Sequence, residues 1–335
     1  MGVKARRRAL EYAVLLGGTA LAGTLLGFCG RAAWIADLFA HFRVQYVVLL
    51  AVAAGLAAIA SWRLLAAVFV AAMLINVALI APFWLSRGVE PAPPRLRIGY
   101  LNVLTSNRDK AAVSRWIDTS GADVVLAVEI DEGWHQSLVK ASSYDLALSQ
   151  PRSDNFGMAL LVRRGGAATV TSAGLAAVFD TLFDVPVIEA RVGFGDCELR
   201  LLGLHTLPPT GPRYAAARDG QLAMAATWAR GGGPALVLGD LNATRWSHPF
   251  RALLRDGELV DSARGFGLHP TWPAFPGPIA VFRIPIDQAV HSESLVTTRR
   301  ELGPFVGSDH FPLLLELAWR AGEPCEALPD NEQRR

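Results

Sequence analysis

The distribution of apolar and charged residues divides the chain into an N-terminal, membrane-like part and a longer part of mixed character. Three stretches, 12–30, 44–62 and 64–86, contain no Asp, Glu, Lys or Arg. As a helix, each stretch is long enough to cross a hydrocarbon core of about 30 Å. The pattern therefore predicts a membrane region over residues 1–86, with three transmembrane helices at about 11–30, 44–62 and 64–86.

Beyond this region, short apolar runs alternate with amphipathic segments. The apolar, β-rich runs predict strands at 96–103, 123–129, 157–163, 185–192, 198–204, 234–239, 284–290 and 311–319. Helical periodicity is found at 108–119, 213–230 and 247–255. Many of the predicted strands are apolar on both faces, which is typical of sheets that are covered on both sides. We therefore predict an α/β domain built of layers.

Proline and charge mark the two ends of this domain. Residues 86–95 read SRGVEPAPPR, and the prolines and glycine predict a stiff linker over 87–95. The segment 96–320 is long enough for one substantial core and shows no internal repeat. The segment 321–335 is polar and charged, and we expect a disordered tail.

Basic residues indicate which way the predicted helices cross the membrane. Four of them, Lys4, Arg6, Arg7 and Arg8, precede the first span, whereas the connection 31–43 has two. The excess predicts a cytoplasmic N-terminus, and three crossings then place everything after Ser86 outside the cytoplasm. The localisation expected is a multi-pass membrane protein with an extracytoplasmic domain. A two-span or re-entrant arrangement would reverse this orientation, and a cleaved signal peptide is the alternative for the first stretch.

Composition narrows the range of partners. The high hydrophobic content, 52%, is explained by the membrane region. Residues 95–320 contain 22 Lys and Arg against 23 Asp and Glu, so the domain is near neutral and its charge does not indicate nucleic acid. No protein partner is indicated. Cys29 lies in a predicted span, while Cys197 and Cys325 could pair in an oxidising compartment, which the sequence leaves open.

Polar residues with catalytic potential stand where the predicted strands end or begin. The run LVLGDLN brings Asp240 and Asn242 to the end of an apolar strand, and residues two apart point to the same side of an extended chain. The other residues in such positions are Asn102, Glu129, His205, Asp287, Asp309 and His310. Because α/β sheets gather their sites at strand ends, we expect these side chains to share one cleft.

These residue types favour one kind of chemistry. Carboxylates and amides without a Cys/His cluster favour a hard cation, Mg²⁺ or Mn²⁺, with Ca²⁺ as a further option. A histidine beside an acid can move protons or support developing charge near neutral pH. Together these groups indicate metal-assisted hydrolysis of a phosphate ester.

The same residues, taken in order, carry a family resemblance. The series is NVL at 102–104, VE at 128–129, HT at 205–206, GDLN at 239–242, ID at 286–287 and SDH at 308–310. It resembles the endonuclease/exonuclease/phosphatase superfamily, and the membrane region with the FGMALLV, HTLPP and TWP stretches looks most like its bacterial membrane-bound branch. The resemblance covers essentially all of 95–320. It implies a four-layer α-β-β-α sandwich, with two facing mixed sheets and helices outside.

The resemblance also implies roles for individual residues. Glu129 would be the principal metal ligand, with Asn102 and Asp309 completing the metal and phosphate environment. Asp240 would orient or deprotonate the attacking water, helped by Asn242.

The remaining roles concern the phosphate. His310 would contact the phosphate oxygen that becomes charged, Asp287 would hold the His310 ring, and His205 would be a second phosphate-facing group. Trp272 could stack on the substrate or simply cover the core. One departure from several nucleases of the superfamily is Leu104, where they carry an acid, and this weakens a nuclease interpretation.

Structural explanations compete with these roles. Asn102 could cap a turn at 105–109, Glu129 could belong to a helix start at 129–132, and Asp240 with Asn242 could form an Asx-turn and helix cap. Asp287 could pair with Arg283, and His205 could be a core histidine. We interpret four further histidines as structural or solvated residues in surface segments: His135, His248, His269 and His291.

Two classes of function therefore follow from the sequence. The first is a membrane-anchored, divalent-metal-dependent phosphoesterase acting on a phosphodiester such as a lipid headgroup or nucleic acid, with the substrate undefined. The second is a catalytically silent module that binds a phosphorylated ligand or partner. Diesterase and monoesterase activity, the number of metals and the oligomeric state stay open.

Overall fold

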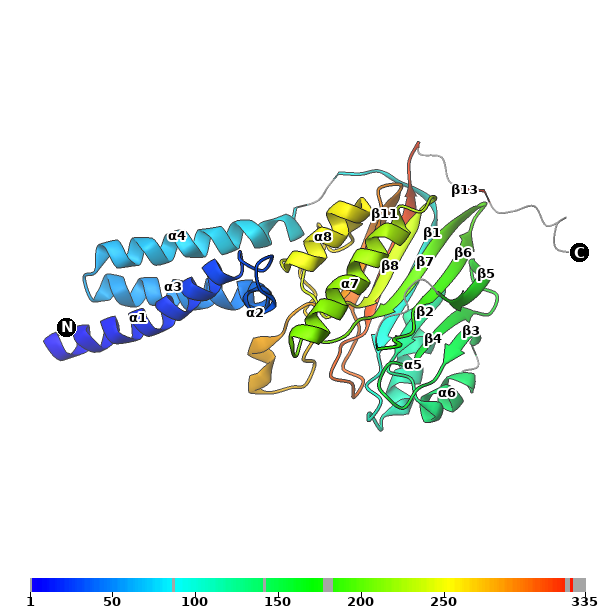
Figure 1. Cartoon of the computed structure of the whole chain (residues 1–335), viewed down its shortest axis with the longest axis horizontal. Helices are drawn as coiled ribbons and strands as arrows, with labels where there is room; N and C mark the ends of the chain where they lie inside the picture. The colour runs from blue at the N-terminus through cyan, green and yellow to red at the C-terminus, as the bar shows by residue number, and fades with distance from the viewer. Residues whose placement is uncertain (1, 86–87, 141–142, 177–182, 323–325, 328–335) are drawn as a thin grey trace, which may run out of the picture.

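Three long helices form a bundle at the N-terminal end of the molecule (Figure 1). The computed structural model describes residues 2–85, 88–140, 143–176, 183–322 and 326–327. The helices of this region, called the helical region below, are α1 (Val3–Leu26), α2 (Trp34–Leu38), η1 (Phe39–Phe42), α3 (Arg43–Ile59), α4 (Arg63–Ile80) and η2 (Ala81–Phe83). Three stretches are long and apolar enough to cross a membrane, the number predicted: Val3–Leu26, Trp34–Ile59 and Arg63–Phe83. The first begins earlier than predicted and includes the four basic residues that were expected to precede it.

The rest of the described chain contains two mixed sheets. The first has the strand order β11-β12-β1-β2-β4-β3 and the second the order β5-β6-β7-β8-β10-β9, with β13 paired to β7. The strands of the first sheet are β1 (Pro91–Asn102), β2 (Val124–Val128), β3 (Tyr144–Gln150), β4 (Met158–Arg163), β11 (Leu295–Leu302) and β12 (Leu313–Arg320). Those of the second are β5 (Ala168–Leu175), β6 (Ile188–Phe194), β7 (Cys197–His205), β8 (Ala235–Asp240), β9 (Leu259–Asp261), β10 (Asp287–Ser292) and β13 (Glu326–Ala327).

Apolar residues fill three layers between and outside the sheets. Side chains such as Ile98 of β1 and Leu238 of β8 form the core between the two sheets. The outer face of the first sheet packs on α5 (Lys110–Ser120) and α6 (Glu132–Val139), and that of the second on α7 (Pro212–Ala229) and α8 (His248–Gly257). Strands that are apolar on both faces thus lie in sheets covered on both sides. The predicted four-layer sandwich is confirmed.

Strand direction brings the polar strand ends to one edge of the sandwich. In the first sheet β1 and β2 are parallel, and in the second β7 and β8 are parallel. β12 runs antiparallel to β1, and β10 runs antiparallel to β8, so both begin at the edge where their neighbours end. Asp287 and Asp240 are direct partners across β10 and β8. Residues from six segments therefore meet at one edge.

The structure differs from the expected linker in one respect. β1 begins at Pro91, so most of the proline-rich segment is part of a strand. This end of β1 pairs with β12 alone, because pairing with β2 starts only at Ile98, and a bulge lies between Ala92 and Arg95. Prolines are tolerated there because their missing N–H groups face no second partner strand.

The helical region meets the sandwich through polar as well as apolar contacts. His41 Nδ1 lies 2.9 Å from Thr244 Oγ1, and Trp246 Nε1 donates to the carbonyl oxygen of Leu79 at 3.1 Å. The Gly267 N–H donates to the carbonyl oxygen of Phe83 at 2.7 Å. These contacts join the connection between α1 and α3, and the end of α4, to the loops that follow β8 and β9. The two parts of the molecule are therefore packed against each other rather than joined only by the linker.

Candidate active site

The predicted site residues converge at the polar edge of the sandwich. A pocket of about 480 Å³ lies there. Seven of the nine predicted residues line it: Glu129, His205, Asp240, Asn242, Trp272, Asp309 and His310. The other two, Asn102 and Asp287, are buried against Glu129 and His310, with contacts of 2.8 Å in each case. The structure thus brings all nine together.

Asp240 and Asn242 reach the pocket through a turn rather than through continued extended chain. β8 ends at Asp240, and Asn242 has a φ of +46°. Asp240 Oδ1 accepts from the Asn242 N–H at 2.9 Å, which is the expected Asx-turn contact, and Asn242 Nδ2 donates to the carbonyl oxygen of Thr206 at 2.8 Å. Neither residue caps α8, because Ser247 does so. The turn leaves Asp240 Oδ2 facing the two histidines of the site.

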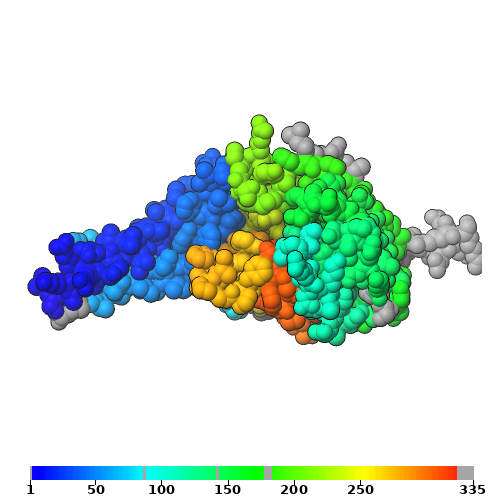
Figure 2. Space-filling view, turned by 90° about the horizontal axis from the view of Figure 1, so that it is seen from below, coloured from blue at the N-terminus to red at the C-terminus, as the bar shows by residue number. Residues whose placement is uncertain are grey.

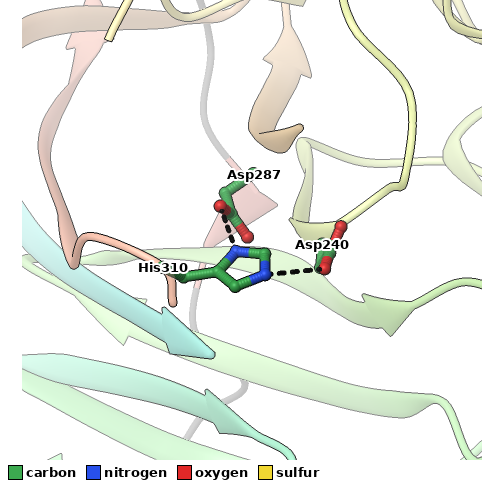
Figure 3. A group of neighbouring side chains, drawn as sticks. All are labelled: Asp240, Asp287 and His310. Atoms are coloured by element: carbon green, nitrogen blue, oxygen red, sulfur yellow. Dashed lines mark hydrogen bonds and ion pairs between the residues drawn. The ribbon is translucent and has the colours of Figure 1, made fainter. Parts of the chain in front are cut away.

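His310 stands between two buried carboxylates (Figure 3). Its Nδ1 lies 2.8 Å from Asp287 Oδ2, and its Nε2 lies 3.7 Å from Asp240 Oδ2. Burial alone would lower the pKa of His310, but the charges of Asp287 and Asp240 outweigh it and raise the pKa to about 10. His310 is therefore an imidazolium near neutral pH.

In Asp240 and His205, unlike His310, burial sets the direction of the pKa shift. Burial and the nearby Asp287 carboxylate raise the pKa of Asp240 to about 8. Burial and the charge of His310 lower the pKa of His205 to about 4, so its ring is neutral near pH 7. His205 Nε2 lies 3.8 Å from Asp240 Oδ2, and the Phe156 ring lies 5.0 Å from the His205 ring. Asp240 thus lies between the charged imidazole of His310 and the neutral imidazole of His205.

Glu129 is held at the pocket wall by neutral donors. It follows β2 with a φ of +64°, and α6 begins three residues later with Asp131 as its cap, so Glu129 is not part of the helix start. Its Oε1 accepts from Asn102 Nδ2 at 2.8 Å and its Oε2 from the Thr105 N–H at 3.2 Å. Burial raises the pKa of Glu129, and the negative charge of Asp309 acts in the same direction.

Asp309 is the second acid on this wall of the pocket. Its Oδ2 accepts from Trp272 Nε1 at 3.1 Å. Its Oδ1 is buried, and within the described part of the chain no hydrogen-bond donor reaches it. Trp272 is therefore placed at the site through its indole N–H as well as through its ring.

The competing structural explanations fare differently. Arg283 does not pair with Asp287, because its guanidinium donates to the carbonyl oxygens of Pro273, Ala274 and Phe275. Asn102 does support the turn that follows it, since its Oδ1 accepts from the Leu104 N–H at 3.0 Å.

One interpretation of the remaining histidines was wrong. His291 is not in a surface segment: it is buried in β10, and its Nε2 lies 3.0 Å from Thr297 Oγ1. The pairing of Cys197 with Cys325, which the sequence leaves open, is not tested, because Cys325 lies outside the described residues.

Several residues at the site were not identified from the sequence. His41, from the connection between α1 and α3, lines the pocket. Arg218 of α7 is fully buried, donates to the Asn242 carbonyl oxygen at 2.9 Å and pairs with Asp37 at 3.4 Å. Ser308 Oγ donates to the Asn102 carbonyl oxygen at 2.6 Å. Only Ser308 carried a signal, through its place in the SDH series; nothing local to 37–41 points to the pocket.

The acidic and histidine groups could hold a cation in two ways. Ligand atoms of Asp240, Asp287 and His310 lie within 4.8 Å of one another. A cation at His310 Nε2 would require loss of the imidazolium proton, which the raised pKa of His310, about 10, opposes. Glu129 and Asp309 face the same pocket with no charged partner on either acid among their described hydrogen bonds and ion pairs. The part of the pocket formed by Glu129 and Asp309, called the Glu129 wall below, is therefore the better cation site.

Comparison with known proteins agrees with this architecture. The model of the Endonuclease/Exonuclease/phosphatase family matches residues 99–310, and the chain belongs to this family. A search of curated proteins finds no match.

Solved structures share the fold at low sequence identity. A Bacteroides vulgatus endonuclease/exonuclease/phosphatase is 17% identical with a TM-score of 0.57, over 68% of this chain and 100% of that chain. D. rerio TDP2 complexed with a single-strand DNA product is 17% identical with a TM-score of 0.55, over 67% and 99%. A Bacteroides thetaiotaomicron mannosyl-6-phosphatase is 17% identical with a TM-score of 0.50, over 67% and 100%.

Proposed function

We propose that this chain is a membrane-anchored, divalent-metal-dependent phosphoesterase that hydrolyses a phosphate ester by in-line attack of water. One observation carries the proposal: acids, amides and imidazoles from six separate segments converge in one pocket, in the order typical of the family. A binding module alone would not require Asp240 and the Asp287–His310 pair as well as the acids Glu129 and Asp309.

The Glu129 wall fits a hard divalent cation. Asp309 has a buried oxygen that no described donor reaches, and Glu129 has only neutral donors, so two acids share the wall without a compensating cation. Glu129 and Asp309 would hold the ion, while Asn102 would keep the Glu129 carboxylate in place. Mg²⁺ or Mn²⁺ suits these oxygen donors best, with Ca²⁺ as a further option. When bound, the ion would supply positive charge that stabilises the phosphate in the transition state.

A second group of the pocket residues, Asp240, His205 and the Asp287–His310 pair, called the His310 wall below, would handle water and the developing charge. Asp240 Oδ2 would orient the attacking water and, in the ionised form that its pKa of about 8 allows in mildly alkaline solution, accept its proton; Asn242 would fix the turn that aims this oxygen. The neutral His205 ring would contact the phosphate or the water. The His310 imidazolium, held by Asp287, would donate toward the phosphate oxygen that gains charge during attack.

The substrate class is a phosphate ester, with lipid headgroups and nucleic acid as the two candidates from the sequence. The related folds include a protein solved with a single-strand DNA product and a mannosyl-6-phosphatase, so the same fold accepts both diesters and monoesters. The near-neutral charge of residues 95–320 does not favour long nucleic acid. Trp272, which is partly exposed at the pocket, would stack on the group that carries the phosphate.

The helical region would anchor the enzyme in the bacterial inner membrane. Its three apolar helices are long enough to span, and the basic residues Lys4, Arg6, Arg7 and Arg8 in the first turns of α1 favour a cytoplasmic N-terminus. Three crossings would place the sandwich on the extracytoplasmic side.

Removal and return of the metal test the proposal. The full chain is used, because the helical region contributes His41 to the pocket and Asp37 to the buried contact with Arg218. Purified protein, stripped with EDTA, should lose hydrolysis of bis(4-nitrophenyl) phosphate and 4-nitrophenyl phosphate, and Mg²⁺ or Mn²⁺ should restore at least one of them. A folded sample that turns over neither ester with Mg²⁺, Mn²⁺ or Ca²⁺ would instead support a silent binding module.

A further inference from the structure

An exposed apolar segment lies beside the active-site pocket. Residues 270–282, called the apolar loop below, contain no charged residue and end in the 3-10 helix η4 (Pro278–Phe282). Its large side chains are between 41% and 64% exposed at four positions, Phe275, Ile279, Val281 and Phe282. Large apolar side chains gathered in one exposed segment mark a contact surface for a protein or a membrane.

The apolar loop has a fixed shape. Arg283, the first charged residue after it, turns back and donates to the carbonyl oxygens of Pro273, Ala274 and Phe275 at 2.9 to 3.2 Å. Its guanidinium also lies over the Phe311 ring, 4.9 Å from the centroid. The guanidinium of Arg283 thus holds the loop in place, and the exposed apolar side chains are presented on a preorganised support.

The apolar loop is joined to the helical region at the first turn of α3. Gln45 Nε2 donates to the carbonyl oxygens of Val281 at 3.0 Å and Arg283 at 3.2 Å. Figure 1 shows that α1 ends, α3 begins and α4 ends on the side of the sandwich, so the domain-side ends of all three long helices lie near this turn. Figure 2 shows the orange segment that contains η4 beside the blue helical region. If the three long helices span a bilayer, the apolar loop therefore lies at the membrane surface where they emerge.

The same loop forms part of the pocket wall. Trp272 lines the pocket together with Ile284, which follows the loop, and with His41 from the helical region. The pocket is thus framed by the two parts of the chain that lie nearest the ends of the long helices.

We propose that the apolar loop is a bilayer-contact surface. Its exposed side chains insert into the interfacial layer of the membrane that holds α1, α3 and α4, and the pocket opens at the lipid headgroup layer. Aromatic and apolar side chains without charge favour this depth. A bilayer is the partner that this position favours, because Gln45 joins the loop to the first turn of α3, and a membrane-spanning α3 would place that turn at the lipid surface. The inference rests on membrane insertion of the helices, which is part of the proposed function.

Photochemical crosslinking tests the contact without requiring catalysis. The full chain carries p-benzoylphenylalanine in place of Phe282, an aromatic replacement at an exposed site, and is reconstituted in vesicles of phosphatidylethanolamine and phosphatidylglycerol. Two matched proteins carry the same residue in place of Leu74 in α4 or Val139 at the end of α6. Both of these positions are 55% exposed, close to the 56% of Phe282. Mass spectrometry of the illuminated protein then measures lipid adducts.

The three positions separate the possible failures. We expect position 282 to yield at least about five times more lipid adduct than position 139, and an amount similar to position 74. Adducts at 74 but not at 282 would overturn the apolar loop as a membrane contact and leave the anchor intact. Absence of lipid adducts at both 74 and 282 would overturn membrane insertion, and this inference with it.

Discussion

The two walls of the pocket carry similar residues but balance their charge in different ways. On the His310 wall, Asp287 and Asp240 each have an oxygen within 4 Å of the same imidazole, at 2.8 and 3.7 Å. On the Glu129 wall, the carboxylate receives only the neutral donors of Asn102 and Thr105, and Asp309 receives the indole of Trp272.

This difference indicates which group of acids requires a cation from solution to balance its charge. A buried charge without a counter-charge is costly. The His310 wall supplies its own counter-charge as a proton on an imidazole, whereas the Glu129 wall would need a cation from solution. Substitutions on one wall should therefore change the response to pH, and substitutions on the other should change the response to metal concentration.

Asp240→Asn should cause the largest loss, because the Asp240 carboxylate lies within 4 Å of both His205 and His310. An amide keeps the shape and can still accept from the Asn242 N–H, but it cannot take a proton from water. We expect kcat to fall by about 10⁴-fold, with little change in the metal concentration that gives half-maximal activity. Asp256→Asn, on the exposed end of α8, is the matched control. Full activity of the Asp240 variant would remove this residue from the handling of water.

Glu129→Gln should come next and should separate the two walls. The substitution keeps an acceptor for Asn102 but removes the charge that would hold the cation. Loss of several kcal/mol of charge stabilisation corresponds to about a 10³-fold loss of activity. The metal concentration required should rise together with this loss. Glu132→Gln, an exposed acid in the first turn of α6, serves as the control. An unchanged metal requirement in the Glu129 variant would place the cation elsewhere, with the Asp240, Asp287 and His310 group as the first alternative.

The parts of the fold that could be predicted from the sequence are those buried on both faces. β2, β7, β8 and β12 lie within two residues of their predicted ends, because their runs are almost entirely apolar. The strands missed were β3, β5, β9 and β11, apart from the two-residue β13, and these four are the outer strands of the two sheets. An edge strand has one side open and carries small or polar residues, as in ATVTSAGL of β5, so its pattern resembles a loop.

The site was predictable to the same extent and for a related reason. Polar residues that end apolar strands stand out, because burial of the strand leaves its end as the place where a polar group can serve a cleft. His41 and Arg218 carry no such signal. Arg218 lies in a helix where an arginine is normally solvated, and its burial depends on Asp37, which is 181 positions away. Contacts of this kind are set by how the helical region packs on the sandwich, which no local pattern encodes.

Asp287→Asn tests the His310 wall through pH. Asp287 is the main reason that the pKa of His310 is raised despite burial, so the substitution should lower this pKa. The charged imidazole is then lost as the pH rises through the lower value, and the alkaline limb of the rate profile should move toward neutral pH. We expect about a 10²-fold loss of activity above neutral pH and a smaller loss in mild acid. A uniform loss at all pH values would indicate a purely structural role for Asp287.

Trp272→Phe should have the smallest effect and tests how far the Glu129 wall depends on its supporting contacts. Phenylalanine keeps a ring at the pocket but removes the indole N–H that lies 3.1 Å from Asp309 Oδ2. Loss of such an outer contact typically weakens metal affinity or activity by about tenfold, and we expect a change near this size in the metal requirement. Trp272→Ala also removes the ring, so its additional loss, if it appears in KM rather than in the metal requirement, measures stacking on the substrate. Trp62→Phe, between α3 and α4, is the control for exchange of an exposed tryptophan. If Trp272→Phe leaves the metal requirement unchanged while Glu129→Gln raises it, then the indole contact with Asp309 does not contribute to holding the cation.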